Sequence, residues 1–252
     1  MSEKRFVGHF SCGAASAVAI KLAIEENKRR AHLPFVVVNQ RIKQEHPDNQ
    51  RFLKDCEKWF GVEVQQVVHP IYQGDIYAAF EGEKYIAGIY GAACTRTLKK
   101  ELAAKFWQPG DIDVLGYTAE EQDRYDNWID ANNERRAKPI LIDRGLTKSD
   151  CLAIIERAGI ELPVMYKLGY EHNNCIGCVK AGSGYWNKIR VDFQAEFQRM
   201  ADYSRAKGVR LLKRGDERIF LDELQPGEGN YQQEPEVQCG IFCEMAEKEY
   251  AA

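Results

Sequence analysis

The sequence predicts an α/β fold, an open parallel sheet with helices on both faces, followed by a cysteine-bearing C-terminal extension. Short apolar, β-branched runs alternate with longer segments of helical periodicity as far as residue 162, which is typical of strands joined by crossover helices. The strand-like runs do not alternate polar and apolar residues, as expected of strands buried on both faces. Beyond Pro163, glycines, aromatic residues and paired cysteines replace this rhythm.

The first strand and the first helix are predicted on either side of a turn of small residues. An apolar run ends in Ser11-Cys12-Gly13, and a helical pattern follows from Ser16. Small side chains at Gly13 and Ala14 let a ligand approach the backbone, where the first N–H groups and the dipole of a helix attract anions. The hydroxyls of Ser11 and Ser16 add donors. The turn is either a phosphate site or an ordinary strand–helix connection.

The remaining elements follow in the alternating order of an α/β sheet. Glycine stops one helix at Gly61, and Thr147 with Asp150 in the first turn caps a later one. Strands are expected at 34–39, 62–68, 113–117 and 138–142, and helices at 48–60, at 94–107, through Trp128 and after Thr147.

Three loops are predicted at the carboxyl ends of strands, where ligands of parallel sheets bind. They are Ser11–Ser16, the segment from Asn39 to Asp48, and the segment from Gly116 to Arg124. Their convergence favours the phosphate site over an ordinary turn.

Composition limits the classes of function. The 252 residues are 44% hydrophobic and 29% charged, as in a globular protein with a sizeable core. The formal net charge of −3 gives no support to bulk electrostatic capture of nucleic acid or of a membrane. No apolar run has the length of a membrane span and the first residues lack a signal-peptide pattern, so a cytoplasmic location is expected.

The eight cysteines indicate metal or redox chemistry in such a compartment. Cys175 and Cys178 form a C-x-x-C pair, and a second close pair, Cys239 with Cys243, lies near the C-terminus. Four thiolates suit either tetrahedral zinc or an iron–sulfur cluster. Cys94 begins a helix beside basic residues. Two further cysteines are expected in the core, Cys56 and Cys151.

The ordered motifs resemble those of the phosphoadenylyl-sulfate (PAPS) reductase family. This family belongs to the PP-loop enzymes, whose fold is the Rossmann-like adenine nucleotide α-hydrolase-like sheet. The resemblance is carried by Phe10–Val18, Glu45–Asp48, Cys94–Lys99, Gly116–Arg124, Gly169–Cys178 and Gln238–Ile241.

The resemblance implies an α/β domain at residues 1–162 that binds an adenine nucleotide (PAPS, adenylyl sulfate or ATP). Residues 163–252 would form a cysteine-containing extension packed on it. A Cys239 thiolate would attack the sulfur of the nucleotide, and a thioredoxin-like protein would supply the reducing thiols. A [4Fe–4S] cluster, with zinc as the alternative, would bind at Cys94, Cys175, Cys178 and Cys243. The nucleotide would contact Ser11, Cys12, Gly13, Ala14, Ser16, Asn39, Gly116 and the basic side chains of Arg96, Lys99 and Arg124.

Departures from the family pattern leave two other functions open. Ala15 replaces the aspartate of ATP-consuming PP-loop enzymes, which disfavours thiolation of a nucleic acid with ATP. Ala93 replaces the first of two adjacent cysteines that cluster-bearing reductases have. A non-catalytic, zinc-stabilised nucleotide-binding module is the third hypothesis. The sequence also leaves open whether a second subunit completes the site in a homodimer.

Overall fold

The computed structural model describes residues 4–88 and 91–234. They belong to two compact units, of which the first contains residues 1–41, 46–70 and 101–173 and the second contains the remainder. Cys239 and Cys243, together with the motif at Gln238–Ile241, lie outside the described residues.

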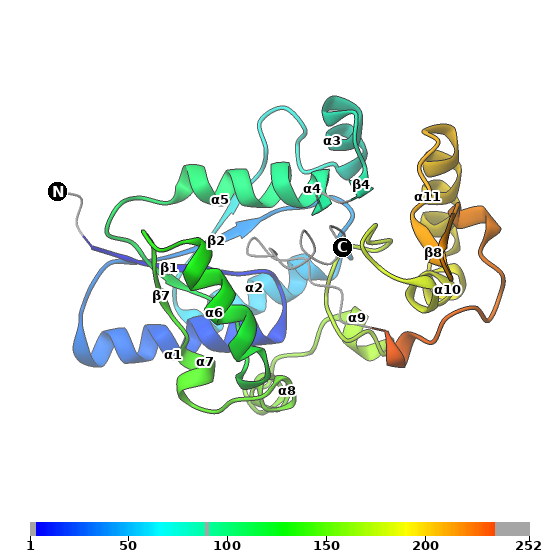
Figure 1. Cartoon of the computed structure of the whole chain (residues 1–252). Helices are drawn as coiled ribbons and strands as arrows, with labels where there is room; N and C mark the ends of the chain where they lie inside the picture. Colours follow the sequence, from blue (N-terminus) through cyan, green and yellow to red (C-terminus); the bar gives the residue numbers. More distant parts are fainter. Residues whose placement is uncertain (1–3, 89–90, 235–252) are drawn as a thin grey trace. The chain divides into compact units, whose positions relative to one another are not determined.

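The first unit is built on a five-stranded parallel sheet, which confirms the predicted fold class (Figure 1). The strand order is β3-β2-β1-β6-β7, with every neighbouring pair parallel. The strands are β1 (Phe6–His9), β2 (Phe35–Gln40), β3 (Val64–Val67), β6 (Ile112–Val114) and β7 (Arg136–Lys138).

Helices flank this sheet, with α1 and α8 on one side and α5 on the other in Figure 1. Gly8 of β1 allows α1 to pack closely, since a Cβ there would lie 2.9 Å from Cγ1 of Ile20. The helices of the unit are α1 (Ala14–Arg30), α2 (Asn49–Phe60), α5 (Glu101–Phe106), η2 (Ala119–Glu121), α6 (Gln122–Ala131), α7 (Ile140–Asp143), α8 (Lys148–Arg157) and α9 (Val164–Lys167).

Two predicted helix ends are confirmed. Gly61 ends α2 in the left-handed conformation, with φ of +66°, which glycine adopts without steric cost. Thr147 caps α8 through the backbone N–H of Asp150, whose carboxylate in turn accepts the Thr147 N–H.

The predicted fifth strand is present as β7, but its predicted bounds, 138–142, are wrong. The pairing with β6 covers Arg136–Lys138, and the apolar run after Pro139 forms the short helix α7. Proline has no N–H with which to continue a ladder, while Ile140 and Leu141 are buried in the core beneath α1. A short apolar run fits a strand and a buried helix equally well.

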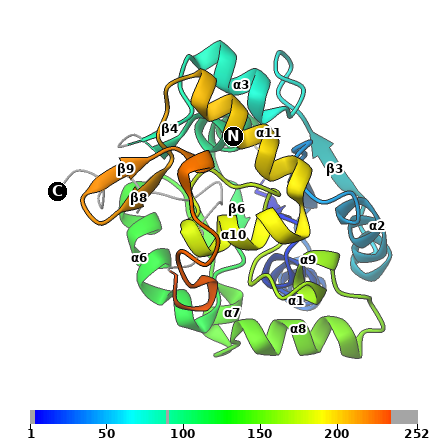
Figure 2. The same ribbon diagram turned by 90° about the vertical axis from the view of Figure 1, so that its right-hand side faces the viewer.

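The second unit is mainly helical, with two small hairpins. Helices α10 and α11 follow one another in this unit (Figure 2). They pack through Trp186 and Phe197, whose ring centroids lie 6.1 Å apart. The unit contains α3 (Ile76–Glu83), β4 (Ala87–Gly88), β5 (Gly91–Ala92), α4 (Ala93–Thr95), the π-helical turn η1 (Arg96–Lys100), α10 (Ser183–Asp192), α11 (Gln194–Ala206), β8 (Leu212–Arg214), β9 (Glu217–Ile219), η3 (Leu221–Glu223) and η4 (Tyr231–Gln233). In neither unit does a described helix have the length and apolar character to cross a membrane.

Candidate functional site

The loop Ser11–Ser16 lies where the strand order of the sheet reverses. The chain runs outward from β1 through β2 to β3, then returns to add β6 on the other side of β1. Such a switch point, at the carboxyl ends of the strands, is where open α/β sheets bind ligands. The loops that follow β1 and β6 border this point.

Gly116, in the loop after β6, lies directly against the first turn of α1. A Cβ at Gly116 would lie 2.7 Å from the backbone nitrogen of Ser16 and 2.8 Å from its Cα. Real Cβ atoms do not approach backbone so closely, so a glycine is required here. The predicted convergence of these two loops is confirmed.

Hydrogen bonds between the two serines set the shape of the loop. The Ser16 hydroxyl accepts the N–H of Ser11 at 3.2 Å, lies 3.1 Å from the Ser11 hydroxyl and donates to the Gly13 carbonyl at 2.9 Å. Between them, Cys12 is buried and has φ of +57°, a left-handed conformation that is uncommon for a residue with a Cβ. The predicted site residues between Ser11 and Ser16 thus form a single compact turn.

Asn39, at the end of β2, ties that strand to the loop. Its side-chain amide donates to the Phe10 carbonyl at 2.8 Å and lies 3.7 Å from the Cys12 sulfur. Its side-chain oxygen accepts a hydrogen bond from Gln66 at 3.2 Å. The Asn39 side chain therefore joins the loop after β1 through its nitrogen and Gln66 of β3 through its oxygen.

The first turn of α1 carries the N–H groups that an anion would contact. Ala14 donates its N–H to the hydroxyl of Tyr166 at 3.2 Å. Within residues 4–88 and 91–234, no acceptor bonds to the N–H groups of Ala15 and Ser16. At the amino end of a seventeen-residue helix, such groups hold partial positive charge.

Tyr166 and Asn173 are residues of this site that the sequence analysis missed. The Tyr166 hydroxyl also accepts the backbone N–H of Asn173, and burial raises the pKa of this hydroxyl to about 12. The Asn173 amide donates at 2.7 Å both to the Cys12 carbonyl and to Asn49. Asn173 is 5% exposed, and its side-chain oxygen accepts no hydrogen bond from the described residues.

Asp48, from the predicted Glu45–Asp48 motif, holds the segment that carries Tyr166. Its carboxylate forms two hydrogen bonds with Arg51, at 2.7 and 2.8 Å, and accepts the N–H of Val164 at 3.0 Å. Mainly because of the Arg51 hydrogen bonds, the pKa of Asp48 is lowered. Val164 begins α9, two residues before Tyr166.

The three predicted basic residues each lie beside a carboxylate. Arg124, in the same unit as the loop, pairs with Glu121 and lies over the Tyr117 ring, 5.2 Å from its centroid. The other two belong to the second unit, where Arg96 pairs with Glu83 at 2.7 Å and Lys99 lies 3.9 Å from Glu45.

Comparison of the chain with protein-family models gave no match, and comparison with curated proteins gave none. The resemblance to PAPS reductases therefore rests on the motifs alone.

Two cysteines were predicted in the core, and the structure confirms both. Cys56 and Cys151 are fully buried. Burial raises the pKa of both thiols, that of Cys151 to about 12. Neither thiol is suited to act as a nucleophile or a ligand, because these roles need the thiolate.

The C-x-x-C pair forms a buried turn in the second unit, organised by Tyr185. The Tyr185 hydroxyl accepts the N–H groups of Gly177 and Cys178, at 3.1 and 3.3 Å, and donates to the Cys175 carbonyl at 3.0 Å. Burial raises the pKa of Tyr185 well above its ordinary value, so this hydroxyl stays protonated and can donate. Gly177 has φ of +74°, as the turn requires.

The described cysteines do not assemble a metal centre by themselves. Cys175 and Cys178 are buried and Cys94 is half-buried, but among the described residues no three metal-ligating side chains form a group that could hold an ion. The residues described here therefore do not fit a cluster without a further ligand, and the predicted fourth ligand, Cys243, lies outside them. The metal site stays a prediction.

Proposed function

We propose that the chain binds the phosphate or sulfate end of an adenine nucleotide on the Ser11–Ser16 loop and acts as a PAPS reductase-like enzyme. One observation carries the binding proposal. The Ser16 backbone lies at the amino end of α1, against Gly116, at the switch point of a parallel sheet.

The physical chemistry of the loop favours an anion. N–H groups at Ala15 and Ser16, the positive end of the α1 dipole and two serine hydroxyls all lie within one turn. Cys12, Gly13 and Ala14 contribute no charged group that would repel a phosphate.

The chemistry assigned to this enzyme is thiol-dependent reduction of a sulfonucleotide. The Cys239 thiolate attacks the sulfur, a sulfur–sulfur bond forms, and the bond from sulfur to the phosphate oxygen breaks, so that the nucleotide leaves with the electron pair. A thiolate of a dithiol protein then attacks Cys239 and displaces sulfite. The second thiol of the dithiol protein then attacks the mixed disulfide and releases Cys239 as a thiolate. The dithiol thereby loses two electrons and becomes a disulfide. No step is assigned to a metal cluster.

Thiolation of a nucleic acid with ATP is the competing function. Such enzymes must bind Mg²⁺ with the pyrophosphate, and a carboxylate is the usual protein ligand of that ion. Ala15 stands where the related enzymes have an aspartate. The loop is therefore better suited to a sulfonucleotide than to ATP with Mg²⁺.

Calorimetric titration with adenylyl sulfate, PAPS and ATP tests the proposal. Gly13→Val fills the approach to the backbone, and Ser16→Ala removes the acceptor of the Ser11 N–H. Each should weaken binding about tenfold or more, which corresponds to about 1.4 kcal/mol. Ser149→Ala, an exposed serine of α8, serves as the matched control. Unchanged affinity in both loop variants contradicts the site, and tighter binding of ATP than of sulfonucleotides favours the competing function.

A further inference from the structure

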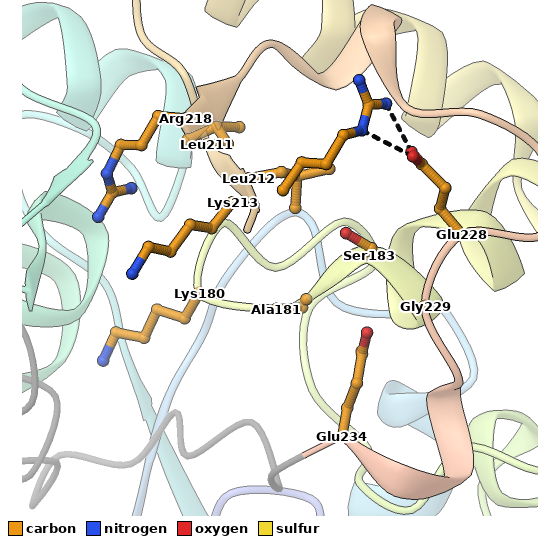
Figure 3. A pocket seen from close by; sticks show the side chains of 12 residues that line it. Lys180, Ala181, Ser183, Leu211, Leu212, Lys213, Arg218, Glu228, Gly229 and Glu234 are labelled. Atoms are coloured by element: carbon orange, nitrogen blue, oxygen red, sulfur yellow. Dashed lines mark hydrogen bonds and ion pairs between the residues drawn. The ribbon is translucent and has the colours of Figure 1, made fainter. Parts of the chain in front are cut away.

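Helix α10 is capped by a residue from a distant part of the chain. Its N-cap residue, Gly182, has no side chain with which to accept the N–H groups of the first turn. The Glu234 carboxylate accepts those of Gly184 and Tyr185, the latter at 3.0 Å. These are the second and third residues of the helix, whose N–H groups the side chain of an N-cap residue normally accepts. Figure 3 shows the Glu234 side chain in the wall of a pocket, pointing toward Ser183 at the start of the helix.

Three glycines make room for this contact. A Cβ at Gly182 would lie 2.7 Å from the carboxyl carbon of Glu234, and a Cβ at Gly229 would lie 2.9 Å from its Oε1. A Cβ at Gly184 would lie 2.3 Å from the backbone nitrogen of Tyr231, so this glycine lets the chain before Glu234 approach the helix. A larger side chain at any of the three positions would push Glu234 or its backbone away from α10.

The contact also joins the segment that ends at Glu234 to the C-x-x-C turn. Tyr185, whose N–H binds Glu234, holds this turn through its hydroxyl, which accepts the N–H of Gly177 and donates to the Cys175 carbonyl. The rings of Tyr185 and Tyr231 lie 6.2 Å apart between centroids. Tyr185 thus contacts the turn with its hydroxyl and the segment before Glu234 with its ring.

Glu234 is the last described residue, and Cys239 follows it by five residues. An extended chain spans at most about 3.6 Å per residue, so a fixed Glu234 keeps the two Cα atoms within about 18 Å of each other. Without this contact, the last anchor would be Tyr231, eight residues before Cys239. The effective concentration of a tethered group falls roughly as the −3/2 power of the tether length, so this change alone lowers it about twofold. The loss of orientation adds to that effect.

We propose that Glu234 is a positioning residue of the sulfonucleotide reaction and anchors the segment that carries Cys239 beside the C-x-x-C turn. The inference rests on the proposed function, in which the Cys239 thiolate attacks the sulfur of the nucleotide. Binding of the nucleotide belongs to the Ser11–Ser16 loop and not to Glu234. The anchor therefore controls the rate of the attack and leaves the affinity for the nucleotide unchanged.

A role as helix cap alone is the alternative, and two variants separate the roles. Glu234→Ala removes the cap and the anchor together. Adding Gly182→Ser supplies a local cap, because the backbone there already has the extended conformation of an N-cap residue, with φ of −83° and ψ of −173°. The added serine does not restore the anchor.

Glu81→Gln is the matched control. The Glu81 carboxylate belongs to the same unit and also accepts two hydrogen bonds, from the hydroxyl of Tyr203 and from Nζ of Lys207. The substitution removes a comparable charged acceptor at a position on α3 that does not contact α10 through these bonds.

The experiment measures release of the nucleotide from adenylyl sulfate in a single turnover without added dithiol, which reports transfer of the sulfonate group to Cys239. Calorimetric affinity and melting temperature are measured on the same full-length variants. Glu234→Ala should lower the melting temperature and slow the release about tenfold, with unchanged affinity. Gly182→Ser with Glu234→Ala should recover the melting temperature but remain slow, and Glu81→Gln should keep the wild-type rate.

A wild-type rate in Glu234→Ala, or recovery of the rate together with the melting temperature in the double variant, overturns the positioning role and leaves the proposed function intact. A loss of affinity that accounts for the whole loss of rate overturns it as well. If the wild type itself releases no nucleotide from adenylyl sulfate or from PAPS, the proposed function fails, and the inference falls with it.

Discussion

The hydroxyl of Tyr166 accepts a hydrogen bond from the backbone N–H of Ala14, with 3.2 Å between oxygen and nitrogen. This contact joins α9 to the first turn of α1. It satisfies one of the N–H groups that a helix leaves unpaired at its amino end. The groups that follow, at Ala15 and Ser16, are the ones that the proposed anion would contact, and Tyr166 occupies the N–H group before them.

Tyr166→Phe should lower the free energy of unfolding by about 1–2 kcal/mol at neutral pH, because the buried N–H groups of Ala14 and Asn173 lose their acceptor. Chemical denaturation measures this loss. The affinity for an adenine nucleotide should change as well, since the loop loses a support. A variant with native stability and native affinity would show that the hydroxyl is dispensable.

The same variant should alter the dependence of stability on alkaline pH. Burial raises the pKa of Tyr166 to about 12, whereas a tyrosine of the unfolded chain ionises near pH 10. The contribution of the neutral hydroxyl is therefore fully present below about pH 10 and is lost as the pH rises through about 12. The difference in stability between the wild type and Tyr166→Phe should narrow over that interval. A constant difference would contradict the assignment.

Gly116→Ala should be far more harmful than Gly13→Ala. The new Cβ would lie 2.7 Å from the Ser16 backbone nitrogen at Gly116, but 3.3 Å from the nearest atom, the Ser11 hydroxyl oxygen, at Gly13. Backbone of a packed helix yields less easily than a hydroxyl, so we expect Gly116→Ala to cost about 1–3 kcal/mol of stability. Thermal unfolding and nucleotide titration of both variants provide the comparison. Equal effects would contradict the close packing.

Local signals account for what the sequence predicted correctly. The strand–turn–helix unit around Gly13, the glycine stop at Gly61 and the capping box at Thr147 are each encoded within a few residues. The burial of Cys56 and Cys151 follows from helical periodicity, which is also local. These features required no knowledge of distant segments.

Contacts between distant segments explain what the sequence could not predict. Tyr166 lies 152 residues from Ala14, and nothing near either residue indicates that they meet. Asp48 belongs to the Glu45–Asp48 motif, but its partner Val164 is 116 residues away. The run Ile140–Asp143 forms a helix where the sequence predicts a strand, because a short apolar run fits either a strand or a buried helix and its periodicity does not distinguish them.

Asp48→Asn should destabilise the first unit at neutral pH and lessen its sensitivity to acid. The Arg51 hydrogen bonds hold the pKa of Asp48 below its ordinary value. The stabilisation by the ionised Asp48 carboxylate is therefore fully present above about pH 4, the pKa of an aspartate in the unfolded chain. It is lost as the pH falls through the lowered pKa of the folded chain. Urea denaturation at neutral pH should show a loss of about 1–3 kcal/mol, with a smaller loss near pH 2.5. The exposed Asp130→Asn is the control, and equal losses at the two pH values would refute the linkage.

Replacing Cys175 and Cys178 by serine should remove the metal that the sequence predicts. The two thiols lie in one turn held by the Tyr185 hydroxyl, and serine is a poor ligand for soft metals. Iron, sulfide and zinc are measured after anaerobic purification, with iron and sulfide together expected in the wild type. Cys151→Ala, which changes a core thiol, should keep the metal. Metal retained at full stoichiometry in the double variant would contradict the assignment.

The variant Cys239→Ser distinguishes between two roles of Cys239, that of the nucleophile and that of a metal ligand. A thiolate that carries the sulfonate group cannot be replaced by a hydroxyl of much higher pKa, so release of sulfite should cease. The metal content and the melting temperature should stay at wild-type values, because Cys243 and not Cys239 is assigned to the cluster. Cys243→Ser should show the opposite pattern, with loss of metal. Release of metal or unfolding in Cys239→Ser would make Cys239 a ligand, and the nucleophilic role would then have to be abandoned.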